Sequence, residues 1–436
     1  MKAKAVNRNY KWVIAAICCI TVMIALGLCS SSKGLFLKPI TEGLGIPRGL
    51  FSITDTIRYA TTALVNLVFA ALVAKMGAKR MMILGVLSLT VSMLLYSFAP
   101  AGGSALTYAA VYGAGFFLGL GLAWSTTTMI GYVVGQWFTK DRGTVMGVVL
   151  ASNGLGSALA SKLLNPVIIG EATVFGQTGF RISYQLVAGL LVAVIVMLLI
   201  FFRNAPEGEL AGKAPAKKRR GRQWVGIEWN EITKKYYFYV TALCVFLTGA
   251  ALQSVGSVSK AHLTDIFGES FATTIFATFS LVLCGTKLLS GFSYDRMGLR
   301  KTMLICNTAA AVGIFALALV PAEMKAVGMA AQIILAFAMP LETVMLPLIA
   351  ADMFGEKCFP KVMGLFVSIN TAGYAVGSPI TNAAFDALGS YRTILTIFGA
   401  LMTVIAVVEQ IDLHHAEKDR EDFLAKLEAS KGSPEA

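Results

Sequence analysis

The chain has 436 residues, of which 56% are hydrophobic and only 14% are charged, and its mean hydropathy is +0.71. A soluble protein of this length needs more polar surface than this, so the composition excludes a soluble globular class and indicates membrane-spanning helices. The net charge of +13 could indicate a nucleic-acid partner, but membrane topology explains it better, and we expect no nucleic acid.

The apolar runs lack the alternation of membrane strands, so we predict an all-α polytopic membrane protein. Its expected architecture is twelve transmembrane helices in two pseudo-symmetric six-helix bundles. The first run starts at Trp12 without a small-residue cleavage site, which favours a retained span over a removed signal peptide. The predicted spans are residues 12–36, 51–74, 80–99, 105–134, 144–169, 181–202, 237–259, 271–293, 302–320, 327–353, 362–385 and 392–412.

Basic residues are divided unevenly between the two sides of this topology. The two tails and the loops on their side carry 27 Lys and Arg residues, whereas the opposite side carries six. Because basic residues concentrate on the cytoplasmic side, we predict an integral protein of the plasma (inner) membrane with both termini in the cytoplasm. Four basic residues fall inside predicted spans: Lys33, Arg58, Lys162 and Lys287.

The longest polar stretch separates the spans six and six. Its "KKRRGR" could contact nucleic acid or lipid headgroups, but we favour a cytoplasmic topology anchor. The predicted domains are an N-terminal bundle (1–202), a cytoplasmic central loop (203–235), a C-terminal bundle (236–413) and a cytoplasmic tail (414–436).

Two segments indicate that the halves are repeats. "KDRGTVMGVVLASNGLG" (140–156) and "KCFPKVMGLFVSINTAG" (357–373) superpose with a constant shift of 217 residues, which pairs Asn153 with Asn370 and Gly156 with Gly373. Six spans is an even number, so both copies enter the membrane in the same direction. Parallel repeats are typical of two-bundle transporters, with substrate between the bundles near the midplane.

The segment "GFSYDRMGLRK" (291–301) closely resembles the Gly-x-x-x-Asp-Arg-x-Gly-x-Arg-Lys loop of the major facilitator superfamily. The first-half copy, "AALVAKMGAKR", keeps Gly77 but has Ala74 in place of the acid. The resemblance implies a cytoplasmic gate at this loop, in which Asp295, Arg296 and Arg300 would form contacts in one state and release them in another.

Other segments resemble the monocarboxylate-porter and oxalate–formate-antiporter branches of that superfamily: "GQWFTKDRGTVMGVVLASNGLG", "LFLKPITEGLGIPRGLFS", "GFR", "RNAPE" and "LGSY". The branch implies carboxylate substrates. Lys287 stands where its eighth span usually carries an arginine, Lys33 is near a lysine of the monocarboxylate porters, and Asn370 replaces the second base of oxalate-type members. One strong cation favours a monocarboxylate over a dianion. Leu283 replaces the aspartate of proton-coupled porters.

The residues themselves leave alternatives open. Lys287 could snorkel or be paired, but intramembrane charges mark transport pathways, so we favour carboxylate binding. Asp55 and Arg58 are three residues apart and share a helix face, as a structural ion pair or as a gate or coupling site. Glu342 is the deepest acid by our span assignment, between prolines that should break span 10, and is a protonation site, a substrate contact or a satisfied structural acid.

The remaining candidates are weaker. Lys33 and Lys260, at the outer ends of spans 1 and 7, either attract anions or lie at the membrane interface. Asn153 and Asn370 either face the cavity or form hydrogen bonds between helices. Their neighbouring glycines favour close helix packing. Trp124, Tyr374 and Gln253 either line the cavity or pack. The seven cysteines and three histidines show no ligand spacing, so we expect no metal and no cofactor.

We therefore predict a secondary transporter of small organic anions, with monocarboxylates favoured, that works by alternating access with proton symport or anion exchange. The alternatives are efflux of a larger organic compound or drug and oxalate/formate-type dicarboxylate exchange. We expect a monomer in the lipid bilayer, and no enzyme activity.

Overall fold

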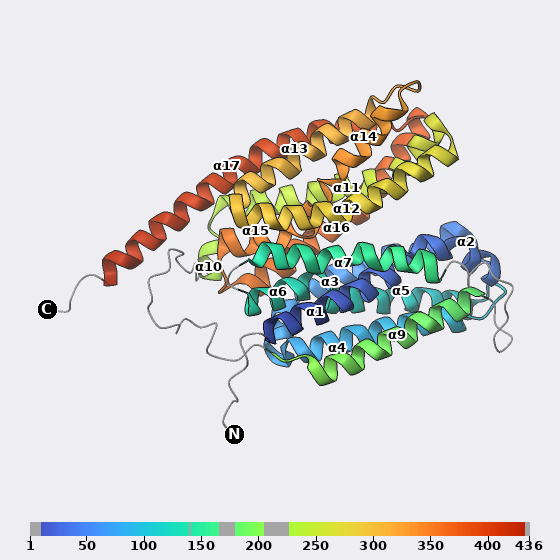
Figure 1. Ribbon diagram of the computed structural model, residues 1–436, viewed down its shortest axis with the longest axis horizontal. Coiled ribbons are helices and arrows are strands. Elements are labelled where there is room, and N and C mark those ends of the chain that lie inside the picture. The colour runs from blue at the N-terminus through green and yellow to red at the C-terminus, as the bar shows by residue number, and fades with distance from the viewer. Residues whose placement is uncertain (1–9, 139–140, 165–178, 205–225, 432–436) are drawn as a thin grey trace. The chain divides into compact units, whose positions relative to one another are not determined.

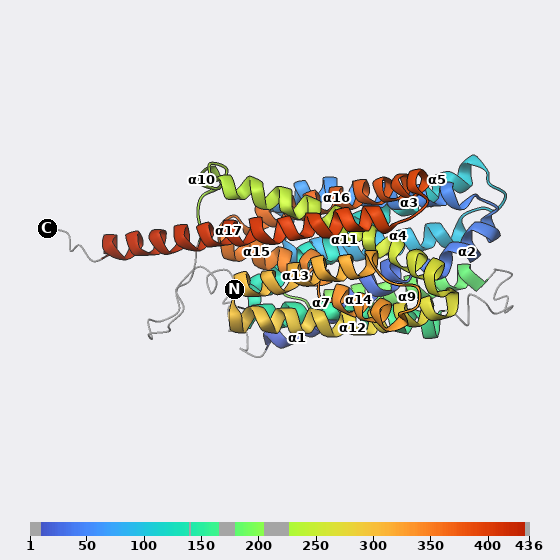
Figure 2. The same cartoon turned by 90° about the horizontal axis from the view of Figure 1, so that it is seen from above.

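The computed structural model describes residues 10–138, 141–164, 179–204 and 226–431. Within these ranges all regular structure is helical (Figures 1 and 2), as the sequence predicts. Nine helices of the described residues are long and apolar enough to cross a membrane. They correspond to nine of the twelve predicted spans. The helices of spans 2, 8 and 11 also form.

The residues fall into two compact units (Figure 1). The first contains the helices up to α9 and also residues Leu283–Gly291 of α12. Its elements are α1 (Tyr10–Val22), η1 (Met23–Ser31), α2 (Lys33–Leu44), α3 (Arg48–Leu67), α4 (Phe69–Phe98), α5 (Ala105–Ser125), α6 (Thr127–Trp137), α7 (Arg142–Leu163) and α9 (Gly179–Phe201).

The second unit contains the remaining helices. They are α10 (Trp229–Ile232), α11 (Tyr236–Phe267), the rest of α12 (Glu269–Met297), α13 (Leu299–Ala318), α14 (Lys325–Ala336), η2 (Met339–Glu342), α15 (Met345–Phe354), α16 (Phe359–Leu388) and α17 (Arg392–Lys431). Residues 205–225 of the predicted central loop lie outside the described residues. Helix α17 continues from the last span into the predicted tail.

Four predicted spans are interrupted. Span 2 breaks at Val68, where α3 ends and α4 begins. Span 1 changes from α-helix to the π-helix η1 before α2 begins at Lys33. Span 4 breaks at Thr126, between α5 and α6. Span 10 is broken as its prolines predict: α14 ends at Ala336, η2 carries Pro340, and α15 starts at Met345. A proline cannot donate a backbone hydrogen bond, so the helix cannot continue regularly through this sequence.

Glycines from the repeated segments bring equivalent helices together in each unit. A Cβ added to Gly156 of α7 would lie 2.0 Å from the carbonyl oxygen of Met23, and one added to Gly373 of α16 would lie 2.2 Å from that of Phe246. Only a residue without a side chain permits such backbone contact. The predicted close-packing role of these glycines is confirmed.

The two copies of the superfamily loop also share a backbone conformation. Gly77 has φ 77° and ψ 157°, and Gly298 has φ 81° and ψ 173°. A side chain is disfavoured at these positive φ values, which explains the glycine at both positions. The pseudo-symmetry predicted from sequence therefore extends to the turns.

Candidate functional site

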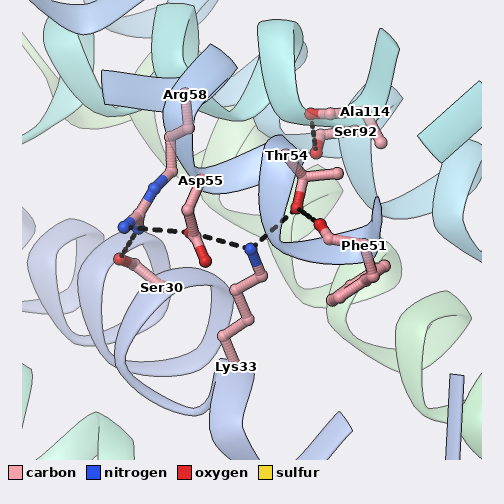
Figure 3. Close-up of polar contacts among 8 residues, drawn as sticks. All are labelled: Ser30, Lys33, Phe51, Thr54, Asp55, Arg58, Ser92 and Ala114. Atoms are coloured by element: carbon pink, nitrogen blue, oxygen red, sulfur yellow. Dashed lines mark hydrogen bonds and ion pairs between the residues drawn. The ribbon is translucent and has the colours of Figure 1, made fainter. Parts of the chain in front are cut away.

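Two cations share one carboxylate in the first unit (Figure 3). The Lys33 Nζ atom lies 2.7 Å from Asp55 Oδ1, and Arg58 Nη2 lies 3.3 Å from the same oxygen. The predicted common face of Asp55 and Arg58 is confirmed as an ion pair. The addition of Lys33 from a different helix is a contact that sequence reasoning did not foresee. We call Lys33, Asp55 and Arg58 the charged triad.

Hydroxyl groups and an aromatic ring orient the triad. Lys33 Nζ donates to Thr54 Oγ1 at 3.0 Å, and Thr54 Oγ1 donates to the Phe51 carbonyl at 2.6 Å. The Lys33 ammonium also lies 5.1 Å from the centre of the Phe51 ring. Arg58 Nη1 donates to Ser30 Oγ at 2.7 Å. Each cation is therefore held from two directions.

The π-helix η1 places the first-span members of this site. It carries Ser30 and ends at Ser31, two residues before Lys33. A π-helix is wider than an α-helix, so it rotates the following residues relative to a regular helix, and such segments are frequent at functional sites. A periodicity of 3.6 residues cannot reveal this shift.

Helix α3 holds Asp55 and Arg58 on a rigid base. A Cβ added to Gly119 of α5 would lie 2.5 Å from the Arg58 carbonyl oxygen, and one added to Gly115 would lie 2.9 Å from that of Thr54. The Arg58 guanidinium also lies 4.3 Å from the Tyr59 ring centre. The backbones of α3 and α5 are thus in direct contact beneath the charged groups.

The triad carries a net positive charge within a partly buried environment. The side chains of Arg58, Lys33 and Asp55 are 10%, 16% and 39% exposed. Two cations against one anion leave a charge of +1 when all three are ionised. A half-buried positive charge that retains access to solvent can attract and bind an anion.

Lys287, the other predicted cation of the site, is buried in α12 and only 5% exposed. It lies in the stretch Leu283–Gly291 that belongs to the first unit. The side chains of Lys162 and Lys260 lie outside the described part of the structure.

The two repeat-related asparagines both form hydrogen bonds between helices. Asn153 Oδ1 of α7 accepts a hydrogen bond from Ser31 Oγ of η1 at 2.9 Å. Asn370 Nδ2 of α16 donates to the Val245 carbonyl of α11 at 3.1 Å. In each unit, the fifth span therefore contacts the first span through the same repeat position. Of the two predicted alternatives, the interhelical hydrogen bond is observed.

The three uncharged candidates lie on different helices. Trp124 of α5 packs its Cβ atom against Gly85, and its Nε1 atom is buried without a hydrogen-bond partner among the described residues. Gln253 and Tyr374 are half-buried on α11 and α16. These positions are equally compatible with a helix-packing role.

The remaining charged candidates are in the second unit. Glu342 ends η2, at the break in span 10, and its side chain is half-buried. Asp295 and Arg296 are exposed at the end of α12, and the Arg296 guanidinium lies 4.3 Å from the Phe292 ring centre. Arg300 Nη1 lies 3.8 Å from Glu417 Oε2 on α17. This last contact connects the predicted gate to the final helix.

Sequence reasoning missed two buried acids of α17, Glu409 and Asp412. Glu409 of α17 is only 5% exposed, and its Oε2 atom accepts a hydrogen bond from Asn307 Nδ2 at 2.5 Å. Glu409 is more buried than Glu342, which the span assignment made the deepest acid. Glu409 lies three residues before the predicted end of span 12. An acid at that position is also expected at the membrane interface, so the sequence did not mark it as buried.

The helical units and the buried charges define the class of polytopic helical membrane transporters. The family model of the Major Facilitator Superfamily matches residues 16–255 and 241–422, and the chain belongs to this superfamily. The predicted superfamily is thereby confirmed. A relative from Bacillus subtilis (strain 168), described as "Uncharacterized MFS-type transporter YcxA", is 23% identical over 299 residues, 67% of each chain.

Solved structures share the fold. The fucose:proton symporter FucP of E. coli matches with a TM-score of 0.69 at 13% identity, over 92% of this chain and 99% of its own. The proton:xylose symporter XylE matches with a TM-score of 0.70 at 12% identity, over 92% and 95%. The human organic anion transporter MFSD10 matches with a TM-score of 0.68 at 12% identity, over 92% and 99%. At these identities the likeness establishes the fold alone.

Proposed function

We propose that this chain is a secondary transporter of small organic anions, with monocarboxylates as the favoured substrates, working by alternating access. The observation that carries the proposal is the charged triad, in which Lys33 and Arg58 share the single carboxylate of Asp55. A substrate carboxylate can take the place of Asp55 on the Lys33 ammonium. Lysine is a point charge on a flexible stem, so it accepts a carboxylate without strict geometry.

Lys287 supplies a second cation to the proposal. It is buried, and intramembrane charges mark transport pathways. Of the structural neighbours, one is an organic anion transporter and two are sugar symporters. Anionic and neutral substrates must therefore be compared directly.

The triad also suggests how transport is coupled. When a substrate carboxylate occupies Lys33, Asp55 loses a cation partner, and binding of a proton then neutralises it. This sequence of events is proton symport. Exchange of one anion for another at Lys33 needs no proton and is the alternative. Glu342 is the second coupling candidate, and Asp295, Arg296 and Arg300 are the proposed gate. We also propose a monomer in the plasma membrane with cytoplasmic termini.

Uptake of labelled substrates into proteoliposomes tests the proposal. A thermal-shift screen of mono- and dicarboxylates and of neutral sugars first selects the ligand, because ligands that bind the folded state stabilise it. Lys33→Gln and Lys287→Gln should then each reduce carboxylate uptake at least tenfold. Lys325→Gln is the matched control, since it removes an exposed lysine at the start of α14. Normal carboxylate uptake by Lys287→Gln, or stabilisation by sugars alone, would overturn the assignment.

A further inference from the structure

Glu409 is buried within the second unit without a cation. It is 5% exposed, and its hydrogen bond comes from the neutral amide of Asn307. Among the residues that the structure describes, no lysine, arginine or histidine lies within ion-pair distance of its carboxylate. An ionised carboxylate in such a place is costly unless it binds a proton or another cation.

A small cavity lies beside this carboxylate. Its volume is about 10 Å³, which is roughly the space that one water molecule needs. Three polar side chains line it, from three helices: Thr248 of α11, Asn370 of α16 and Glu409 of α17. The rest of the lining is apolar and includes Met303, Leu346 and Ile349. The cavity is therefore polar only where these three side chains meet.

A water in the cavity could supply the hydrogen-bond partner that the Thr248 hydroxyl group needs. Thr248 is only 5% exposed, and its buried Oγ1 atom has no hydrogen-bond partner within the described ranges. Asn370 is 3% exposed and uses Nδ2 on the Val245 carbonyl, so its Oδ1 atom is the group it can offer the cavity. A water here would accept from Thr248 and donate to Asn370 and Glu409, which are the three bonds typical of buried water.

We propose that Glu409 is a proton-binding site of the second unit, loaded through a single water held by Thr248 and Asn370. In the loading step, hydronium in the cavity transfers one proton to the free oxygen of the Glu409 carboxylate and becomes water. The product is a neutral carboxyl group that donates to the same water. The bond from Asn307 to the other oxygen is retained. No electron is exchanged.

The surrounding groups favour a proton over a metal ion. The cavity offers three oxygen ligands and one negative charge, fewer than hard cations such as Ca²⁺ require. Within the described residues no group of three His, Cys, Asp or Glu side chains could hold a metal ion. A neighbouring acid, Asp412, lies three residues along α17 and is 2% exposed, so a proton on Glu409 also relieves repulsion between like charges.

The other titratable groups on the packed helices are neutral, paired or at the helix ends. The thiols of Cys244 and Cys306 lie on the facing turns of α11 and α13. Asp352 of α15 is paired with Arg420. Further titratable groups of these helices include Glu342 at the end of η2, Arg300 and Lys301 in the first turn of α13, and His415 beyond Asp412.

Proton occupancy would bias how these helices pack. Asn370 links the cavity to the backbone of α11, and α16 contacts α11 through Gly373. Neutral Glu409 permits a closely packed junction of α11, α13, α16 and α17 that retains only this one water. Ionised Glu409 draws in water and loosens it. If the proposed transport function holds, this equilibrium couples a proton to movement of the second unit.

Infrared difference spectroscopy of the protein in lipid, recorded while the pH is stepped, tests the site without reference to substrate. The wild type should show a carboxylic-acid band that titrates, that is lost in Glu409→Gln and that is retained in the control Glu421→Gln, at an exposed acid of the same helix. Thr248→Val keeps the charge of Glu409 but removes a hydrogen-bond partner of the water, so it should shift the pH at which the band titrates. This variant tests the proposal even if Glu409→Gln does not fold. The proposal would be overturned if the band were unchanged in both Glu409→Gln and Thr248→Val. It would also be overturned if NaCl, but not choline chloride, displaced the band.

A transport measurement separates this inference from the proposed function. Glu409→Gln should lose accumulation driven by a proton gradient but keep counterflow of the same substrate, since counterflow needs no net proton movement. Loss of both gradient-driven accumulation and counterflow would show that Glu409 has a structural role, and it would contradict proton coupling through this residue. If no anion is transported by the wild type, the proposed function fails, while the infrared band still decides the proton site.

Discussion

The ammonium of Lys33 lies 2.7 Å from the carboxylate of Asp55, and the two residues come from helices that are separate in sequence. The same Asp55 oxygen lies 3.3 Å from Arg58. The cation that we propose for substrate binding is therefore already paired with a carboxylate before any substrate arrives. An incoming anion exchanges one carboxylate for another, so binding does not require a bare charge to be maintained in the protein.

We expect Asp55→Asn to lower the thermal stability of the protein because it leaves Lys33 and Arg58 adjacent without a counter-charge. Adding Lys33→Gln should restore part of the loss. Because the Asp55 side chain is 39% exposed, solvent screens the pair, and the coupling energy should be about 1 kcal/mol. Thermal unfolding of the four proteins of the double-mutant cycle measures it. Purely additive effects would show that the pair is not energetically coupled.

Arg58→Lys should be poorly tolerated although it keeps the charge. Arg58 uses Nη1 on Ser30 and Nη2 on Asp55, and one ammonium cannot reproduce that fork while lying over Tyr59. We expect a loss of about 1–2 kcal/mol in unfolding free energy. Arg392→Lys is the control, since Arg392 donates from Nη2 to the Val320 carbonyl, a bond that one ammonium can replace. Equal effects of the two changes would contradict this account.

Gly156→Ala and Gly373→Ala should each destabilise the protein, because the new methyl group meets a backbone carbonyl that cannot move aside alone. We expect a loss of roughly 1–3 kcal/mol for each. Gly189→Ala in α9 has nothing within 4 Å of the added Cβ atom, so it should be neutral or slightly stabilising. Chemical denaturation in detergent compares the three variants. A tolerated alanine at both repeat positions would refute the packing argument.

Outside the spans, Lys357 contacts Glu228, and the hydrogen bond from Lys357 to that carboxylate raises the pKa of the lysine. A raised lysine pKa means that the contact stabilises the folded state below the ordinary lysine pKa and is lost as pH rises through the folded value. Trp229 is adjacent to this contact and lies 3.8 Å from the Lys361 ammonium. Its fluorescence should therefore change at alkaline pH, and Lys357→Met should show the alkaline spectrum already at neutral pH. If the fluorescence of the wild type and of Lys357→Met changed with pH in the same way, the contact between Lys357 and Glu228 would be excluded as the cause.

Much of this protein could be predicted from sequence because its strongest signals are local. Long apolar runs must be helical in lipid, since each backbone group there needs an internal partner. The prolines around Glu342 predicted the break in span 10. The repeat of Gly156 and Gly373 predicted equivalent close packing. The segment ending at Lys301 indicated the superfamily, which the family match confirms.

Tertiary structure decided the contacts between distant residues. Sequence spacing pairs Asp55 with Arg58, which lie on one helix, but it cannot bring Lys33 to the same oxygen, because that depends on the π-helix η1 and on how α2 meets α3. Nor can it distinguish an acid at the membrane edge from one enclosed by four helices, as Glu409 is. Periodicity specifies the faces of each helix, whereas packing determines which faces meet, and the charges of this protein act where faces meet.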